Sequence, residues 1–390
     1  MSIRDWYNSE PVKKFRTDIF RSRRLSPCKG CYLEEAHGGH SRRLKENQKS
    51  VIFSQAFDDS FDQSPSNKHF QYSIDTDGLT DTLPIDLHVN LGNFCNLACK
   101  MCSRDASSTI ASQEVKWGIT DSKQYLGMDW TRNQTVWDSF KQQLLDIPGL
   151  NNIHFMGGET LLTDRFEDLV DTMIEHGRFE LCFSFVTNGT VFKPALMHKL
   201  KLFKRVGIEI SIETLTEHNA YQRQGTKTSE VLENIRRYQD LCNNSSITVT
   251  LRSAPSLLTI GHYHTLLEYA LDQQLLIKSN LCYDPEFLYA INLPAEVKKQ
   301  YLENYNHLAL RLSAVETNDD FNASDPNNFM MSIKQELEMC QALLITPTPH
   351  DIEQQLKQMV DHCRRWDRIY NLNARELYPE LTEVWDRYAY

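Results

Sequence analysis

The chain has 390 residues, of which 41% are hydrophobic and 24% charged, so it can bury one large core or two modest ones. No run of about 18 apolar residues occurs and the N-terminus lacks the apolar core of a signal peptide, which predicts no membrane span and a cytoplasmic location. The net charge of −10 argues against general nucleic-acid binding, although the basic first 50 residues could meet an acidic partner or simply form a solvated face.

Four segments follow one another along the chain. Residues 1–53 are basic and look helical, and residues 54–84 are rich in Asp, Ser and Gln without a clear period, which predicts a linker or irregular insert. Residues 85–290 alternate short β-rich runs with helical stretches, and residues 291–390 are strongly helical.

The alternation within the third segment predicts parallel βαβ units. Strands are expected at 85–91, 152–156, 181–187, 207–212, 247–252 and 276–282, with helices near 131–146, 162–176, 194–204, 229–242 and 262–274. Six strands are too many for a small sheet and fewer than the eight of a complete barrel. The sequence therefore predicts an α/β fold built on an open, partial (βα)6 barrel.

The ten cysteines are unlikely disulfide partners in a reducing compartment. Five of them form two tight clusters, Cys28/Cys31 and Cys95/Cys99/Cys102. Metal binding is the better interpretation for the clusters, and plain burial for most of the others.

The spacing C-x3-C-x2-C places Cys95, Cys99 and Cys102 on one loop after the first expected strand, at the edge where parallel α/β folds have their active sites. Three close thiolates suit a soft metal, and a 4Fe–4S cluster would then keep one iron without a protein ligand. A structural zinc is the alternative, but it generally requires a fourth local ligand. We therefore expect an iron–sulfur cluster with an open iron.

The next strand ends in Gly157, Gly158 and Glu159, where paired glycines allow close backbone approach and the carboxylate can accept from an ammonium group. A common glycine turn that starts a helix is the alternative interpretation. The third strand ends in the polar turn that contains Asn188.

Polar residues also follow the fourth and fifth strands. Alternation puts Ser211 and Glu213 on one face, suited to sugar hydroxyls, unless they belong to a capped turn. Arg223 offers a guanidinium for a carboxylate, and Arg252 lies near the end of the fifth strand.

The motifs CNLACKMC, MGGET, TNGT, SIE and YQRQGT, in this order over roughly residues 85–260, resemble the radical SAM enzymes. The resemblance implies a 4Fe–4S cluster on the three cysteines, with S-adenosylmethionine chelating the open iron. It also implies one-electron cleavage of the sulfonium to methionine and a 5′-deoxyadenosyl radical, which abstracts hydrogen from a substrate.

The resemblance also implies roles for single residues. Glu159 and the backbone of Gly157 and Gly158 would hold the methionine amino group, with Asn188 and Arg252 in the same cofactor site. Ser211 and Glu213 would face the ribose, and Arg223 the methionine carboxylate. Met101 stands where the family often has an aromatic residue, and its thioether can still pack on adenine.

The run CKGCYLEEAHGGHSRRLKEN and the tail NLNARELYPEL are similar to twitch-domain radical SAM proteins, which carry an auxiliary iron–sulfur site. Cys28 and Cys31 would bind it, but only 27 cysteine-free residues precede them where that group usually has further cysteines. The missing ligands would come from Cys282, Cys340 or Cys363, from another chain, or not exist. His37 and His40 are further candidates, and a zinc site, an empty thiol pair and a truncated gene start stay open.

These interpretations predict a radical SAM enzyme with an N-terminal twitch-like segment and a helical C-terminal region. Its substrate is a peptide or protein by analogy, or else a small metabolite such as a sugar or nucleotide. A flavodoxin or ferredoxin would supply the electron. A non-catalytic iron–sulfur or SAM-binding module is the alternative from another functional class.

Overall fold

The computed structural model describes most of the chain. The described residues are 2–21, 23–36, 41, 43–44, 65–120, 128–243, 245–316 and 329–390. The expected candidates His37 and His40, and most of the boundary between the first two predicted segments, lie outside them.

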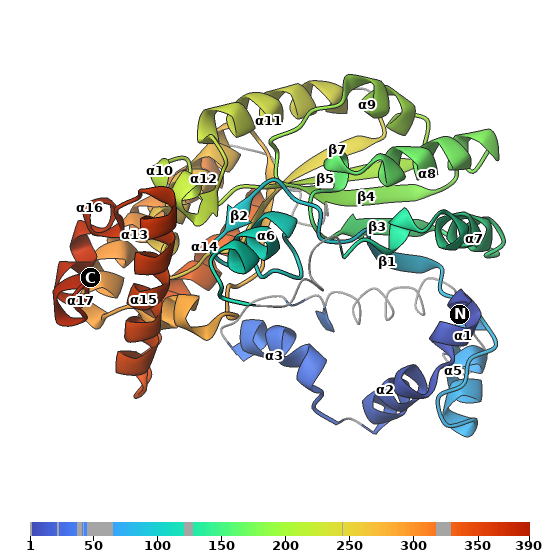
Figure 1. Ribbon diagram of the computed structural model, residues 1–390, viewed down its shortest axis with the longest axis horizontal. Helices are drawn as coiled ribbons and strands as arrows, with labels where there is room; N and C mark the ends of the chain where they lie inside the picture. The colour runs from blue at the N-terminus through green and yellow to red at the C-terminus, as the bar shows by residue number, and fades with distance from the viewer. Residues whose placement is uncertain are drawn as a thin grey trace.

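A six-stranded parallel sheet forms the centre of the fold, in the order β1-β3-β4-β5-β7-β8 (Figure 1). The strands are β1 (Asp86–Asn90), β3 (Asn152–Met156), β4 (Cys182–Thr187), β5 (Arg205–Ser211), β7 (Ile247–Ser253) and β8 (Leu276–Ser279). All neighbouring pairs are parallel, so every strand ends at the same edge. The predicted partial barrel of six strands is confirmed.

Helices between the strands cover one face of the sheet (Figure 1). They are α7 (Gln134–Leu145), α8 (Asp164–Glu175), α9 (Pro194–Leu200), α11 (Thr228–Cys242) and α12 (Ile260–Asp272). Alternate strand residues are fully buried against this layer; for example, Phe155 of β3 lies 4.9 Å from Phe166 of α8 between ring centroids. Period-two alternation in the strands and 3.6-residue periodicity in the helices place both apolar sets in one core.

The C-terminal region is helical, as expected. It contains α13 (Ala295–Glu316), α14 (Phe329–Ile345), α15 (Ile352–Tyr370), α16 (Ala374–Leu377) and α17 (Thr382–Arg387). Helix α14 covers the edge strand β8, where buried Glu336 accepts hydrogen bonds from the backbone N–H and hydroxyl of Ser279. This cover satisfies an edge that would otherwise be open to other strands.

The N-terminal segment forms short helices that lie beside the β1 edge of the fold (Figure 1). They are α1 (Ile3–Tyr7), α2 (Glu10–Phe20), α3 (Lys29–Ala36) and α5 (Pro65–Asp75), with a 3-10 turn at Ser26–Cys28. Helix α5 corrects the expectation of an irregular segment over residues 54–84. Its Phe70 ring packs edge-on against Phe20 of α2 at 5.0 Å, a tertiary contact that the local composition does not reveal. None of the described helices has both the length and the apolar character that a membrane crossing requires.

Candidate active site

The loop that carries the three cysteines follows β1 and is fixed at both ends. Within it, β2 (Ala98–Cys99) pairs antiparallel with β6 (Arg223–Gln224), which places Cys99 opposite Arg223. Ser107 donates to the carbonyl of Leu97 at 2.6 Å and caps helix α6 (Ser108–Lys116). The cysteine loop is therefore anchored before any ligand is considered.

The three thiols are free and differ in surroundings. Cys99 is buried, Cys95 half-buried and Cys102 exposed. A hydrogen bond with Cys102 lowers the pKa of Cys99 to about 7 and, as the other side of the same contact, raises the pKa of Cys102. Burial raises the pKa of Cys95 to about 11. Three free thiols on one loop, two of them in contact, are the set of ligands that a thiolate-bound cluster requires.

Gly157 and Gly158 allow the cysteine loop to pack against the end of β3. Both have positive φ, +88° and +54°. A Cβ on Gly158 would lie 2.4 Å from the carbonyl oxygen of Phe94, the residue before Cys95. The sequence predicted that these glycines let a ligand approach the backbone. In the structure, the segment that approaches Gly158 is the cysteine loop itself.

Glu159 ties three loops of this edge together. Its carboxylate is 2% exposed and accepts from Leu161 N at 3.1 Å, the Thr187 hydroxyl at 2.8 Å and Asn188 N at 2.5 Å. Burial raises the pKa of Glu159, and these three donors oppose the rise. Asn188 in turn donates to the side chain of Asn96 in the cysteine loop at 2.8 Å. Sequence reasoning found Glu159 and Asn188 but missed Thr187 and Asn96, although both lie inside the quoted motifs.

Glu213 and Arg223, expected on different parts of one ligand, are bonded to each other. Arg223 Nη1 lies 3.0 Å from Glu213 Oε1, and both side chains are buried. Glu213 Oε2 also accepts from the Ser253 hydroxyl and from Ala254 N, at 2.8 and 2.7 Å. Burial alone would lower the pKa of Arg223, but the neighbouring Cys99 and Glu213 raise it. Glu213 thus holds Arg223 charged beside the thiols.

Arg223 keeps donor capacity for a ligand. Its Nε is buried and has no hydrogen-bond partner among the described residues. An unpaired buried donor is costly, which makes an acceptor from outside the chain favourable here. Ser211 is buried at the end of β5, two residues before Glu213. The three thiols and this guanidinium therefore fit an iron–sulfur cluster with an anionic ligand.

Arg252 does not join this group. It lies beside Ser211 in the register of β5 and β7, but its guanidinium forms an ion pair with Glu209 at 3.2 Å. On the same sheet, His154 shares a 2.8 Å hydrogen bond with the Ser184 hydroxyl. Polar pairs are unusual inside parallel sheets, whose strands are normally apolar on both faces.

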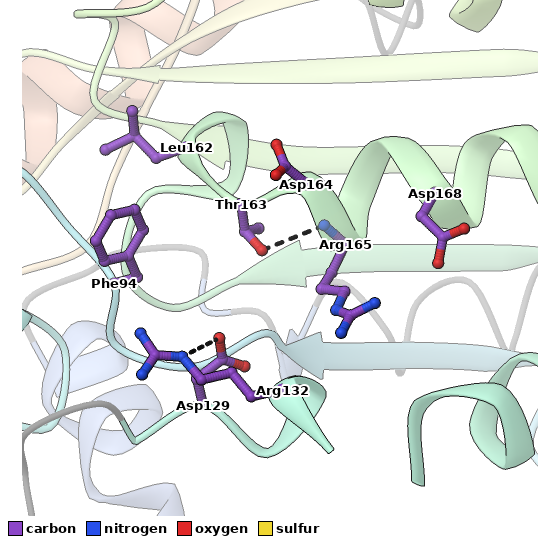
Figure 2. A pocket seen from close by; sticks show the side chains of 8 residues that line it. All are labelled: Phe94, Asp129, Arg132, Leu162, Thr163, Asp164, Arg165 and Asp168. Carbon is purple, nitrogen blue, oxygen red and sulfur yellow. Dashed lines mark hydrogen bonds and ion pairs between the residues drawn. The ribbon is translucent and has the colours of Figure 1, made fainter. Parts of the chain in front are cut away.

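A cavity of about 430 Å³ opens beside Phe94, at the carboxyl ends of β1 and β3 (Figure 2). Its lining residues are Phe94, Asp129, Arg132, Leu162, Thr163, Asp164, Arg165 and Asp168. Arg132 pairs with Asp129, three residues before it in the same turn, at 3.4 Å on one side of this space (Figure 2). The sequence motifs did not indicate this cavity, because charged residues like those that line it are common in the first turns of ordinary helices.

The N-terminal thiol pair lies near the loop after β8. A Cβ on Gly30, between Cys28 and Cys31, would lie 2.3 Å from the hydroxyl of Tyr283, so α3 contacts the chain directly after the buried Cys282. The other two candidate ligands are elsewhere. Burial raises the pKa of Cys363 to about 12 beside Lys100, and Cys340 is buried in α14.

Over the part of the chain that the structure describes, no three His, Cys, Asp or Glu side chains converge as one metal ion would require. A 4Fe–4S cluster does not require its ligands to converge on one point, because each thiolate binds its own iron.

Comparison with known proteins gave one family match and several similar structures. Residues 89–253 match the model of the Radical SAM superfamily. The structure is similar to anSMEcpe with bound AdoMet, with 19% identity and a TM-score of 0.44 over 60% of this chain and 62% of that one. It is also similar to Streptococcus suis SuiB bound to precursor peptide SuiA, with 12% identity and a TM-score of 0.42 over 70% of this chain and 59% of that one.

The chain thus spans less than two thirds of the length of each of these two proteins. A search of curated proteins gave no match. The family match covers the strands and loops on which the cysteine loop, Glu159, Glu213 and Arg223 lie. Residues 89–253, which carry the cysteine loop and these polar residues, therefore form a region that matches the radical SAM superfamily.

Proposed function

We propose that this protein is a radical SAM enzyme that uses Cys95, Cys99 and Cys102 to hold a 4Fe–4S cluster. The observation that carries the proposal is the set of three free thiols on one anchored loop, beside the buried guanidinium of Arg223. When bound, the cluster would supply one electron to cleave S-adenosylmethionine into methionine and a 5′-deoxyadenosyl radical that abstracts hydrogen from a substrate.

The residues around the thiols would bind and orient S-adenosylmethionine. Arg223 Nε can donate to the methionine carboxylate. Glu159 Oε2, which accepts from Asn188 N, can also accept from the amino group beside the Gly157–Gly158 backbone. Binding and orientation of this kind are the protein's share of cofactor chemistry.

Five further residues complete the proposed cofactor site. Ser211 and Glu213 would face the ribose, and half-buried Met101 would pack on the adenine. Asn188 would hold the cysteine loop, and Arg252, whose guanidinium pairs with Glu209, would be the fifth contact. These roles follow from the family resemblance and from the position of each residue.

We propose a peptide or protein as substrate, on the basis of the similarity of two sequence segments to twitch-domain proteins. A small metabolite is the second candidate. A flavodoxin or ferredoxin is the proposed electron donor. All ten cysteines are free, which supports a reducing, cytoplasmic location. An auxiliary iron–sulfur site on Cys28 and Cys31 is supported by the contact of α3 with the loop of Cys282.

Anaerobic reconstitution with iron and sulfide tests the core proposal. With S-adenosylmethionine and dithionite, the wild-type protein should form 5′-deoxyadenosine. Cys95→Ala should form none, whereas Cys242→Ala, a control in α11 on the helical layer, should match the wild type. Cluster formation with a SAM-perturbed spectrum but no 5′-deoxyadenosine would favour the non-catalytic module, and absence of both would refute the proposal.

The auxiliary site has its own measurement. Cys28→Ala should lower the iron content of the reconstituted protein while 5′-deoxyadenosine formation persists. An iron content equal to that of the wild type would refute the proposal of an auxiliary iron–sulfur site.

A further inference from the structure

Lys100 lies inside the cysteine loop, between Cys99 and Cys102, and its side chain is 1% exposed. Its Nζ donates to the carbonyl of Tyr221 at 2.7 Å and lies 3.6 Å from the centroid of the Tyr221 ring. Within the described residues, no carboxylate forms an ion pair with this ammonium. Lysine is almost never fully buried without an opposite charge, because removing the ammonium from water is costly.

Helix α15 forms the wall behind Lys100. The ring centroid of Trp366 lies 5.7 Å from Lys100 Nζ, and Trp366 also packs on Ala98 of the cysteine loop. Asp367 is the nearest carboxylate on this helix, but it accepts from the hydroxyl of Tyr221 at 2.8 Å and from the start of α16. Asp367 thus bonds to these donors and makes no direct contact with the ammonium, which is fixed mainly by a carbonyl and two ring faces.

The second buried cation at this site is differently placed. Arg223 forms an ion pair with Glu213 at 3.0 Å, so its charge is largely balanced within the protein. Lys100 forms no ion pair of this kind within the described residues. The acidic groups near its ammonium are Cys363 and Asp367 of α15 and Cys99 of the cysteine loop. Cys99 is the one of these that the proposed cluster would hold as a thiolate.

We propose that Lys100 is the counter-ion of the cluster held by Cys95, Cys99 and Cys102, and that α15 fixes it there. The inference rests on the proposed function. A cluster bound by three thiolates carries net negative charge, which increases when it accepts an electron. A fixed positive charge in a buried site stabilises the more negative state most. Lys100 is therefore a positioning residue that raises the reduction potential through its charge.

The test compares Lys100→Met with Lys116→Met. Both changes remove one positive charge, but Lys116 is exposed at the end of α6. The proteins are reconstituted anaerobically, and redox titration followed by electron paramagnetic resonance gives the midpoint potential. For Lys100→Met we expect a roughly tenfold lower ratio of reduced to oxidised cluster at a fixed potential, which is about 59 mV for a one-electron couple. Lys116→Met should match the wild type.

A second readout separates this role from a structural one. The metal-free Lys100→Met protein should melt at the same or a higher temperature than the wild type, because methionine is not penalised by burial. If Lys100 only supported the loop, its loss would lower the melting temperature and leave the potential unchanged.

The outcomes are distinguishable. A wild-type potential in Lys100→Met, or an equal shift in Lys116→Met, overturns the inference and leaves the proposed function intact. If Lys100→Met takes up no cluster, Lys100→Gln and Lys100→Arg decide: retention by arginine alone supports the need for charge, and loss from both overturns it. A wild-type protein that binds no cluster overturns both proposals.

Discussion

Replacement of Gly158 by alanine should damage the cysteine loop more than an alanine elsewhere in the same backbone conformation. Gly158 has φ +54°, and its added Cβ would lie 2.4 Å from the carbonyl oxygen of Phe94 and 2.9 Å from the Phe94 nitrogen. Both are backbone atoms, so the clash cannot be relieved by a side-chain rotation. The loop that carries Cys95 must move instead.

The magnitude follows from two terms. An L-residue in the left-handed region costs about 1–2 kcal/mol, and forcing extra volume into a packed contact costs about 1–3 kcal/mol more. Gly177, after α8, provides the matched control, since it has φ +66° and a Cβ there meets no atom within 4 Å. Gly177→Ala should therefore lose about 1–2 kcal/mol and Gly158→Ala about 2–5 kcal/mol.

Urea unfolding of the metal-free proteins measures both free energies. A second measurement, the iron bound per chain after reconstitution, should fall for Gly158→Ala and stay at the wild-type level for Gly177→Ala, because only the first change displaces the neighbour of Cys95. Equal losses of stability in the two variants, or a full iron content in Gly158→Ala, would show that the glycine pair does not support the loop.

Two further predictions concern the parts of the fold around the site. Glu336→Ala should cost about 2–4 kcal/mol in urea unfolding, because it leaves the donors of half-buried Ser279 and the buried hydroxyl of Tyr263 unpaired. Glu338→Ala, an exposed change on the same helix, should cost less than about 0.5 kcal/mol. Similar values for both would refute the role of α14 as an edge cover. Burial lowers the pKa of His262 from 6.5 to about 4, so the unfolded chain binds a proton that the folded chain does not, and stability is lost as the pH falls from about 6.5 toward 4. His262→Gln should reduce this loss by roughly 1–2 kcal/mol after allowance for partial exposure, and the exposed control His307→Gln should not, as unfolding at pH 7 and pH 5 would show.

Local sequence patterns were sufficient to predict the strands of the sheet and the order in which the site residues follow them. Strand β3 shows why: Ile153 and Phe155 are fully buried, while His154 and Met156 between and after them are not. Such alternation is readable from the sequence, because the side chains of a strand point to opposite faces. Residues 65–75 show the limit, since helix α5 is stabilised by packing between Phe70 and Phe20, far apart in the chain.

The partner of each polar side chain could not be predicted in this way. Glu159 and Glu213 both follow buried strands and look equally available to a ligand. In the structure, the Glu159 carboxylate bonds to the turn after β4, and its backbone N–H donates to Phe94 in the cysteine loop. Glu213 instead binds Arg223, which was expected on the same cofactor but not on this carboxylate. Which donor reaches a buried acceptor depends on how neighbouring strands are registered, and local periodicity does not contain that information.

The sequence by itself determined that three thiols and a set of polar groups share one edge of a parallel sheet. This follows from spacing alone, because parallel strands all end at the same side. Only the tertiary structure decided that Lys100 is buried, since its cover comes from Trp366 and Tyr221, which belong to distant helices. A lysine within a polar motif looks solvent-exposed until the helices that remove it from water are in place.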